Sequence, residues 1–308
     1  MLRAGLLYLS EQPSIFRFLK RNGLARRFAS RFVAGETLET AVAAVRELNA
    51  LGITATLDLL GESVHTAVEA RAAVTTATEI LDRIAALKLK ANVSVKLTQF
   101  GLDIDPAICA ENVHRLLDRG RALDTFVRLD MESGLHTQRT LDLFLNDLHP
   151  AYGERVGVVI QSMLRRSRGD VDRLVAAKAR VRLCKGAYQE SPAVAFPDKG
   201  DVDRSYAELM ELLLEHGSYP AIATHDEKLI ARAKRLVWAR GIGRERFEFQ
   251  MLYGVRRDLQ QQLVKEGYNV RVYVPFGTQW YPYLMRRLAE RPANIAFVLG
   301  NLWKEGAR

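Results

Sequence analysis

The stretch NVSVKLT at residues 92–98 is a short β-rich run that carries a cation, Lys96, near its end. Seven other runs share this form, with polar residues toward the end of each. They are TATLDLL (54–60) with Asp58, FVRLDME (126–132) with Asp130, VGVVIQ (156–161) with Gln161, RVRLCKGAY (180–188) with Arg182 and Lys185, AIATHDE (221–227) with Thr224 and His225, FEFQMLYG (247–254) with Gln250, and NVRVYVP (269–275) with Tyr273. The sequence therefore predicts eight strands.

The segments between these runs are amphipathic. In segments such as TLDLFLNDLHP and DEKLIARAKRLVWARG, apolar residues recur at spacings of three and four with charges opposite, which predicts helices. Strands rich in Val, Ile and Leu that alternate with helices are typical of a parallel sheet covered by helices. Eight such units over roughly 250 residues favour a closed (β/α)8 TIM barrel over an open sheet. We expect residues 1–45 to form an N-terminal helical extension and residues 46–308 to form the barrel.

Composition narrows the class of protein. No apolar run approaches the roughly 20 residues of a membrane-spanning helix, and the N-terminus lacks the apolar core of a secretory signal, so we expect a soluble, cytoplasmic protein. Cys109 and Cys184 are 75 positions apart, outside any metal-binding pattern, and are interpreted as reduced structural thiols. The net charge of +9 leaves nucleic acid, anionic lipid and anionic ligands open as partners. The basic stretch 16–32 fits either an interfacial membrane helix or a plain surface helix.

The polar residues of the predicted strands suggest a binding site. In a (β/α)8 barrel the functional groups come from the C-terminal ends of the strands, and an unpaired charge in a buried strand is costly. One alternative is that these charges merely pair with one another. The other is a pocket for an anionic, partly flat ligand, because the set combines cations, one acid, aromatic rings and amide or hydroxyl groups. His225 alone is weak evidence, since a histidine at a strand end is more often structural than catalytic.

Other chemistries lack their usual patterns. There are six histidines but no HxH or HExxH, so we expect no metal site. No GxGxxG follows a predicted strand and no GxxxxGK[ST] occurs, which argues against a Rossmann dinucleotide site and a P-loop. A Schiff-base lyase remains an alternative, since a lysine at a strand end, Lys96 or Lys185, could be its nucleophile.

The helix predicted after the eighth strand carries a ladder of Tyr283, Arg286, Arg287 and Glu290. Residues three or four apart share a helix face, so Tyr283 aligns with both arginines. Their side chains can converge on one carboxylate with charge-assisted hydrogen bonds. The alternative is that the arginines form ordinary surface ion pairs with Glu290.

Six stretches together carry a resemblance: VSVKLTQFG, VRLDME, VRLCKGAY, ATHDEK, FEFQMLYGVRRDLQ and VYVPFGTQWYPYLMRRLAERPAN. In order and spacing the chain resembles the proline dehydrogenase family, and in particular its bacterial monofunctional members. The resemblance implies a distorted (β/α)8 barrel with the last helix over the barrel mouth and FAD bound non-covalently. It implies oxidation of L-proline to pyrroline-5-carboxylate, the first step of proline catabolism, by hydride transfer to FAD.

The resemblance also implies roles for individual residues. Asp130 and Arg182 match the catalytic pair. The substrate-binding positions are Lys96, Arg286 and Arg287 for the proline carboxylate, with Leu252, Tyr273 and Tyr283 around the ring. The cofactor-binding positions are Met131, Gln161, Arg182, Leu183, Cys184, Lys185, Gly186, Ala187, Thr224, His225 and Gln250. Cys184 stands where the family commonly has valine, and its contacts are expected through the backbone.

The resemblance further implies a quinone of the respiratory membrane as electron acceptor, so the basic stretch 16–32 could serve peripheral association at the inner face of the plasma membrane. The short chain argues against a fused aldehyde dehydrogenase domain, so we expect a separate pyrroline-5-carboxylate dehydrogenase to take the product. Nucleic acid is not expected as a partner. The +9 charge is the only support for that alternative.

Overall fold

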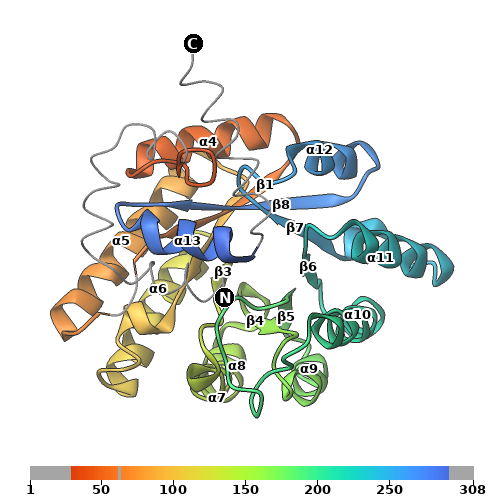
Figure 1. Cartoon of the computed structure of the whole chain (residues 1–308). Coiled ribbons are helices and arrows are strands. Elements are labelled where there is room, and N and C mark those ends of the chain that lie inside the picture. The colour runs from red at the N-terminus through yellow and green to blue at the C-terminus, as the bar shows by residue number, and fades with distance from the viewer. Residues whose placement is uncertain (1–28, 62–63, 291–308) are drawn as a thin grey trace, which may run out of the picture.

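The computed structural model describes residues 29–61 and 64–290 of the 308-residue chain, apart from the side chains of residues 286 and 288–290. Within them, eight parallel strands close into a barrel in sequence order, with β8 paired to β1 (Figure 1). The strands are β1 (Thr54–Leu59), β2 (Ala91–Val95), β3 (Val127–Leu129), β4 (Val156–Gln161), β5 (Arg180–Cys184), β6 (Ala221–Ala223), β7 (Glu248–Leu252) and β8 (Asn269–Phe276). The predicted TIM barrel is confirmed.

Helices surround the barrel (Figure 1). They are α4 (Leu38–Ala50), α5 (Ala67–Ala86), α6 (Pro106–Ala122), α7 (Gly134–Leu143), α8 (His149–Tyr152), α9 (Ser167–Ala176), α10 (Lys199–His216), α11 (Glu227–Ala239), α12 (Arg257–Lys265) and α13 (Trp280–Glu290). A π-helical turn joins α7 to α8. Among these described helices none combines the length and the apolar character that a membrane span requires.

Local sequence explains where several helices begin. The hydroxyl of Thr66 accepts a hydrogen bond from the backbone of Glu69, whose side chain bonds back to Thr66, which forms a complete capping box for α5. Asp105 caps α6, which has proline as its first residue, and Asp226 caps α11. Such caps satisfy backbone N–H groups that have no partner inside the helix. They therefore stabilise the first turns of these helices.

The two faces of the strands differ in character. Apolar residues such as Leu57, Val93 and Val181 belong to the large core packed beneath the helices. On the strands other than β4 and β6, the residues that alternate with them point into the barrel and are polar: Thr56, Asp58, Asn92, Ser94, Arg128, Arg180, Arg182, Glu248, Gln250, Arg271 and Tyr273, with Asp130 directly after β3. A TIM barrel is usually filled by branched apolar residues. This one is filled by a hydrogen-bonded polar network.

Glycine at position 157 makes room for this filling. A Cβ atom there would lie 2.6 Å from Nη1 of Arg128 and 2.8 Å from the ring of Phe126. The Arg128 side chain is 1% exposed and donates from Nη1 to the carbonyl oxygens of Val158 (3.1 Å) and Arg180 (2.6 Å). Gly157 therefore lets an arginine cross the barrel interior.

Residues 29–36 lie across the C-terminal ends of β7 and β8. The backbone of Ala34 donates to the carbonyl of Pro275 (2.8 Å), and Gly277 donates to Gly35 (3.0 Å). A Cβ atom at Gly254 would lie within 2 Å of the carbonyl oxygen of Arg31, so this close approach requires glycine. The segment supports α13 at this end of the barrel. Residues 1–28 of the predicted extension 1–45 lie outside the described residues, and the extension and its boundary stay a prediction.

Helix α13 packs at the same end. Trp280, Tyr283 and Leu284 form a buried cluster with Val33 and with Leu60, which directly follows β1. The indole N–H of Trp280 donates to the carboxylate of Glu36 over 3.1 Å. These contacts place α13 across the mouth of the barrel, as Figure 1 also shows.

Candidate active site

Asp130, the first residue after β3, is the centre of the polar network at the C-terminal ends of the strands. Its Oδ1 accepts from Nη1 of Arg182 (2.7 Å) and from the hydroxyl of Ser94 (2.9 Å). Its Oδ2 accepts from the hydroxyl of Tyr273 (2.6 Å). Burial, with the adjacent Asp130 carboxylate, raises the pKa of Tyr273 well above its ordinary value, so the hydroxyl stays protonated. Both carboxylate oxygens are thus held by donors from three strands, β2, β5 and β8.

Arg182 is 6% exposed, and the described residues leave part of its guanidinium unused. Nη1 is taken by Asp130 and by Ser94 (3.2 Å), whereas the buried Nε and Nη2 have no hydrogen-bond acceptor among residues 29–61 and 64–290. The guanidinium lies 5.3 Å from the centre of the Tyr273 ring. A buried donor without an acceptor costs free energy, so these two nitrogens are candidate donors to a ligand.

Lys96 begins the turn after β2 and pairs with Asp58 of β1 at 2.8 Å. Burial opposes the charged form of Lys96, but the carboxylates of Asp58 and Asp130 outweigh it and raise the pKa of Lys96 above its ordinary value. Burial also raises the pKa of Asp58, against the opposing effect of Lys96. Lys96 is therefore a fixed cation at neutral pH.

Strands β7 and β8 bring together further predicted residues. Leu252 lies directly opposite Tyr273 in the strand register, so the two side chains are neighbours. The backbone N–H of Leu252 donates to Nε2 of His225 over 2.9 Å. That bond requires an unprotonated Nε2, which gives His225 a structural role as acceptor. The side chain of Gln250 is 4% exposed and donates to Glu248.

The loop after β5 holds Lys185, Gly186 and Ala187, all partly exposed. Lys185 forms ion pairs with Asp203 and, at 3.0 Å, with Asp226. Gly186 has φ of 102°, and a Cβ atom there would lie 2.5 Å from the sulfur of Met163. The backbone can therefore present its polar groups at close range.

The remaining predicted cofactor residues fall into two groups. Gln161 and Thr224 are buried and polar; the amide of Gln161 donates to the carbonyl of residue 132 (2.7 Å). The hydroxyl of Thr224 accepts from the backbone of Asp226 (3.1 Å). In contrast, the side chains of Met131 and Leu183 belong to the apolar core, and Cys184 packs against it. The polar groups that Met131 and Leu183 can offer a ligand are therefore those of the backbone.

On α13, the guanidinium of Arg287 lies 5.3 Å from the centre of the Tyr283 ring, and Tyr283 is 6% exposed. The predicted alignment of these two residues on one helix face is therefore observed. The side chain of Arg286, the other half of the predicted clamp, and that of Glu290 lie outside the described residues.

Two residues of this network have no predicted role: Asp58, which the sequence marks only as the polar residue of its strand, and Ser94. An acid in the middle of an apolar strand was the available signal for Asp58. Ser94 gave no signal, since a serine in a strand is unremarkable. Within the described residues, no group of three or more His, Cys, Asp or Glu side chains is placed to hold a metal ion.

A family model described as proline dehydrogenase matches residues 41–299. The chain belongs to the proline dehydrogenase family. Proline dehydrogenase 1 of Bacillus subtilis is 43% identical over 305 residues, covering 99% of this chain and 100% of that protein. Proline dehydrogenase of Deinococcus radiodurans is 40% identical, covering 98% of each chain.

A solved structure extends the likeness to three dimensions. The crystal structure of proline utilization A (PutA) from Bdellovibrio bacteriovorus inactivated by N-propargylglycine superposes with a TM-score of 0.82 at 27% identity. The match covers 90% of this chain but 34% of that one, so this proline dehydrogenase family member corresponds to about a third of the PutA chain.

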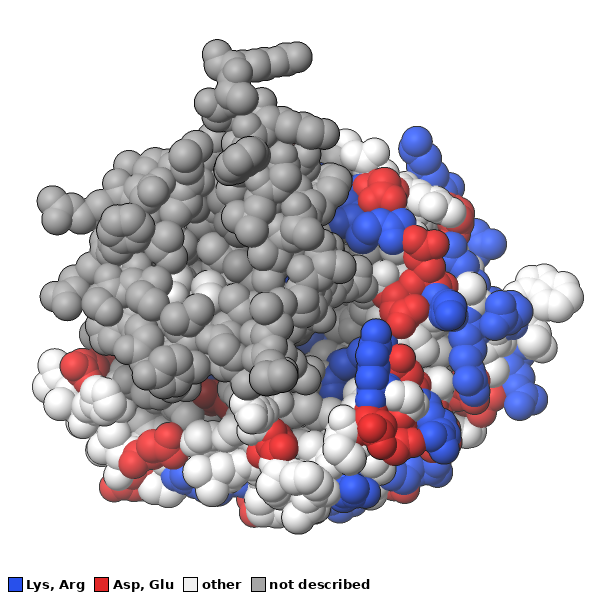
Figure 2. Space-filling model, in the orientation of Figure 1, with Lys and Arg blue, Asp and Glu red and all other residues white. Residues whose placement is uncertain are grey.

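The charge on one face bears on the nucleic-acid alternative. Figure 2 shows Lys and Arg interspersed with Asp and Glu on the side of α10, α11 and α12. Several of them form ion pairs, such as Arg232 with Glu211 at 2.6 Å and Arg240 with Glu215 at 2.8 Å. A nucleic-acid surface needs a field of one sign, which this face does not present.

Proposed function

We propose that the chain oxidises L-proline to pyrroline-5-carboxylate at the barrel mouth, with FAD as cofactor and a quinone as electron acceptor. Family membership supports the substrate. The observation that carries the site is Arg182, a buried cation fixed by Asp130 with two nitrogens that have no acceptor among the described residues. Pairing with Asp130 alone leaves two buried N–H donors of Arg182 without acceptors in the described part of the chain, and a bound ligand would satisfy them.

Lys96, Arg286 and Arg287 bind the proline carboxylate in this proposal. Lys96 suits the role because its raised pKa keeps it charged at neutral pH. Each charge-assisted hydrogen bond to a carboxylate contributes roughly 1.5–3 kcal/mol. Three cations around one carboxylate fix the orientation of a small substrate as well as its affinity.

The pyrrolidine ring packs among Leu252, Tyr273 and Tyr283. Leu252 and Tyr273 are neighbours across β7 and β8, and the Tyr273 hydroxyl is held by Asp130. The rings and the leucine exclude water from the reacting bond. In the reaction, proline loses a hydride from the ring carbon next to nitrogen and a proton from nitrogen.

FAD supplies the hydride acceptor when it is bound. The residues that would hold it are Met131, Gln161, Arg182, Leu183, Cys184, Lys185, Gly186, Ala187, Thr224, His225 and Gln250. The donor set fits an anionic, partly flat group: Arg182 offers two unused N–H donors, and Gly186 allows close backbone approach. With FAD bound, Arg182 would supply a positive charge that stabilises negative charge developing during the reaction.

The Schiff-base alternative is less well supported. A nucleophilic lysine needs a lowered pKa, whereas the pKa of Lys96 is raised by two carboxylates. Lys185 is held in ion pairs with Asp203 and Asp226. Neither lysine presents a free amine.

The remaining proposals concern partners and location. The relatives matched end to end carry the name proline dehydrogenase alone, which supports a separate dehydrogenase for the product. Residues 1–45 as an extension, 46–308 as the catalytic barrel, and peripheral membrane association through 16–32 remain proposals; of the last stretch, only 29–32 lie within the described residues.

The test is turnover of L-proline by the purified protein with a soluble quinone analogue, with the product identified by mass spectrometry. We expect a product two hydrogens lighter than proline and an equal amount of reduced quinone. Absence of turnover in the FAD-loaded protein, together with borohydride trapping of a carbonyl substrate on Lys96 or Lys185, would overturn the proposal in favour of the lyase.

A further inference from the structure

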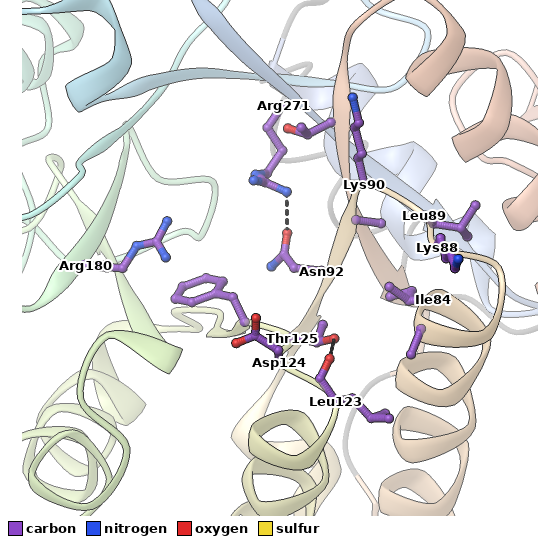
Figure 3. Close-up of a pocket in the computed structure, with 14 residues that line it drawn as sticks. Ile84, Lys88, Leu89, Lys90, Asn92, Leu123, Asp124, Thr125, Arg180 and Arg271 are labelled. Atoms are coloured by element: carbon purple, nitrogen blue, oxygen red, sulfur yellow. Dashed lines mark hydrogen bonds between the residues drawn. The ribbon is translucent and has the colours of Figure 1, made fainter.

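A cavity lies at the end of the barrel where the strands begin, opposite the end that holds Asp130 and Arg182. It has a volume of about 440 Å³, and its lining includes the first residues of β1, β2 and β5 (Figure 3). Nothing in the proposed reaction uses this cavity, since the network around Asp130 and Arg182 lies at the C-terminal ends of the strands.

The lining is rich in cations. Among its side chains are Arg180, Arg271, Lys88 and Lys90, against one acid, Asp124. That acid already pairs with an arginine outside the cavity lining, Arg155. Figure 3 shows the guanidinium groups of Arg180 and Arg271 entering the cavity from different strands. The cavity therefore carries a net positive charge.

The geometry of Arg180 restricts how a ligand can approach it. Its guanidinium lies 4.4 Å from the centre of the Phe126 ring and 4.7 Å from that of Tyr219. The two rings occupy stacking positions, so the edge, with its N–H groups, is what remains for a ligand. The structure gives this guanidinium no hydrogen-bond acceptor among the described residues, and its Nε is fully buried. In-plane N–H donors match the oxygens of a phosphate or carboxylate.

Arg271 adds a second donor with a fixed position. Its Nε pairs with Glu248 (2.9 Å), and its Nη1 donates to the carbonyl of Ala55 (2.8 Å) and to the side chain of Asn92 (2.9 Å). Its Nη2 has no acceptor within the described part of the chain. The guanidinium is thus held rigidly with one nitrogen left for a ligand, which lowers the entropy lost on binding.

The barrel interior behind the cavity increases the attraction for an anion. Arg128, Arg180 and Arg271 are balanced there by one buried acid, Glu248. Burial lowers the pKa of Arg128 well below its ordinary value, and Arg182 and Arg180 lower it further. A negative charge in the cavity would relieve this repulsion.

We propose that this cavity is a binding site for a multivalent oxyanion, specifically a phosphate group held between Arg180 and Arg271 with Lys90 at the rim. Phosphate is favoured over a single carboxylate because the lining holds four cations, of which only Arg271 is paired within the described residues, with Glu248, while its one acid, Asp124, is already paired with Arg155. The phosphate could be free or carried on a small metabolite, since a volume of about 440 Å³ exceeds that of the ion alone.

The test is titration calorimetry of the purified protein with inorganic phosphate, and with glycerol 3-phosphate as a simple phosphomonoester, at constant ionic strength. We expect saturable one-site binding in the wild type. Tighter binding of the monoester would identify a carried phosphate as the ligand, and tighter binding of the free ion would identify inorganic phosphate; either supports the site.

Variants locate the binding. Arg180→Gln should weaken phosphate binding by about tenfold or more. Lys90→Gln should weaken it roughly two- to fivefold; it is the safer variant, because the Lys90 backbone is held by Asn49 while its exposed side chain has no described partner. Arg168→Gln, at an exposed position of α9, is the matched control and should bind as wild type. No saturable binding to the wild type, or equal binding by all three variants, would overturn the proposal.

Discussion

At the scale of single residues, the site contains two buried ion pairs that differ in how fully their hydrogen-bond donors are satisfied. Lys96 and Asp58 satisfy each other at 2.8 Å. Both carboxylate oxygens of Asp130 accept hydrogen bonds, from Arg182, Ser94 and Tyr273, whereas two nitrogens of Arg182 have no acceptor among the described residues. The first pair sets a fixed charge, whereas the second leaves a group that can act on a ligand.

Removing Lys96 should expose the cost of burying Asp58 alone. In Lys96→Met the pKa of Asp58, already raised by burial, should rise further. The Asp58 carboxyl group then stays protonated in the folded state at pH values where it is ionised in the unfolded state, whose carboxyl pKa is about 3.9. The variant should therefore lose stability relative to wild type as pH rises from about 4 through the raised folded pKa, approaching a loss of about 3–5 kcal/mol. Chemical denaturation at a series of pH values measures this.

The control for that experiment is the double variant Asp58→Asn with Lys96→Met. It has no carboxyl group to titrate, so the extra pH dependence should disappear. Persistence of the pH dependence in the double variant would show that another group is responsible.

Arg182→Gln tests the group with unused donors. If its charge stabilises the reaction rather than the bound substrate, anaerobic flavin reduction by proline should slow by roughly 100-fold or more, while the proline dissociation constant changes less. Arg168→Gln serves as the exposed control. Reduction of Arg182→Gln at the wild-type rate in a stopped-flow experiment would remove this role.

At the scale of elements, α13 connects the fold to the substrate site. Leu284 is 5% exposed and packs with Leu60 and Val33, while Tyr283 and Arg287 stack on each other. The position of the proposed clamp therefore depends on the apolar contacts of Leu284, a residue to which the proposal gives no contact with the substrate.

Leu284→Ala should loosen α13, because removal of a buried leucine side chain costs about 2–5 kcal/mol. We expect faster hydrogen exchange across 280–290 and a higher KM for proline, with FAD content retained. Leu135→Ala is the matched control, since Leu135 is 78% exposed on α7. Unchanged exchange and KM in Leu284→Ala would mean that α13 is held by other contacts.

The order of strands and the location of the site could be predicted at this scale. Parallel strands bring their C-terminal ends to one edge, so Lys96, Asp130 and Arg182 were expected to meet, and they do. The role of Asp58 could not be predicted, because its partner lies 38 positions away and the pairing depends on how β1 aligns with β2. Some strands are shorter than their β-rich runs; β3, for example, ends at Leu129 and leaves Asp130 in the loop.

At the scale of the whole molecule, a column of polar side chains fills the barrel along its axis, and apolar side chains cover the outer faces of the strands. The sequence predicted the apolar outer faces, because Val, Ile and Leu recur in the strands. It did not predict the column: an alternating Arg128 or Arg271 looks the same in sequence whether it faces solvent or the barrel axis. Only closure of the sheet places these residues inside.

Glu248 is the acid on which the lower part of this column depends. Burial opposes its charge, but Arg271 outweighs burial and lowers the pKa of Glu248 below its ordinary value. Its contribution to stability is therefore full above the unfolded pKa of about 4.3 and is lost as pH falls through the lowered folded pKa. Glu248→Gln should cost about 3–5 kcal/mol at neutral pH. Denaturant unfolding measures this loss.

Glu79→Gln, exposed on α5, is the matched control and should lie within about 0.5 kcal/mol of wild type. If Glu248→Gln were as stable as this control, the negative charge of Glu248 would not be needed to stabilise the arginines inside the barrel.

The central claim is that the barrel mouth holds FAD and oxidises L-proline. The most direct measurement is the visible absorption spectrum of the purified, FAD-supplemented protein under anaerobic conditions, before and after addition of L-proline. We predict an oxidised flavin spectrum that bleaches when proline is added. A protein that binds no FAD, or a flavin spectrum that L-proline leaves unchanged, would contradict the claim.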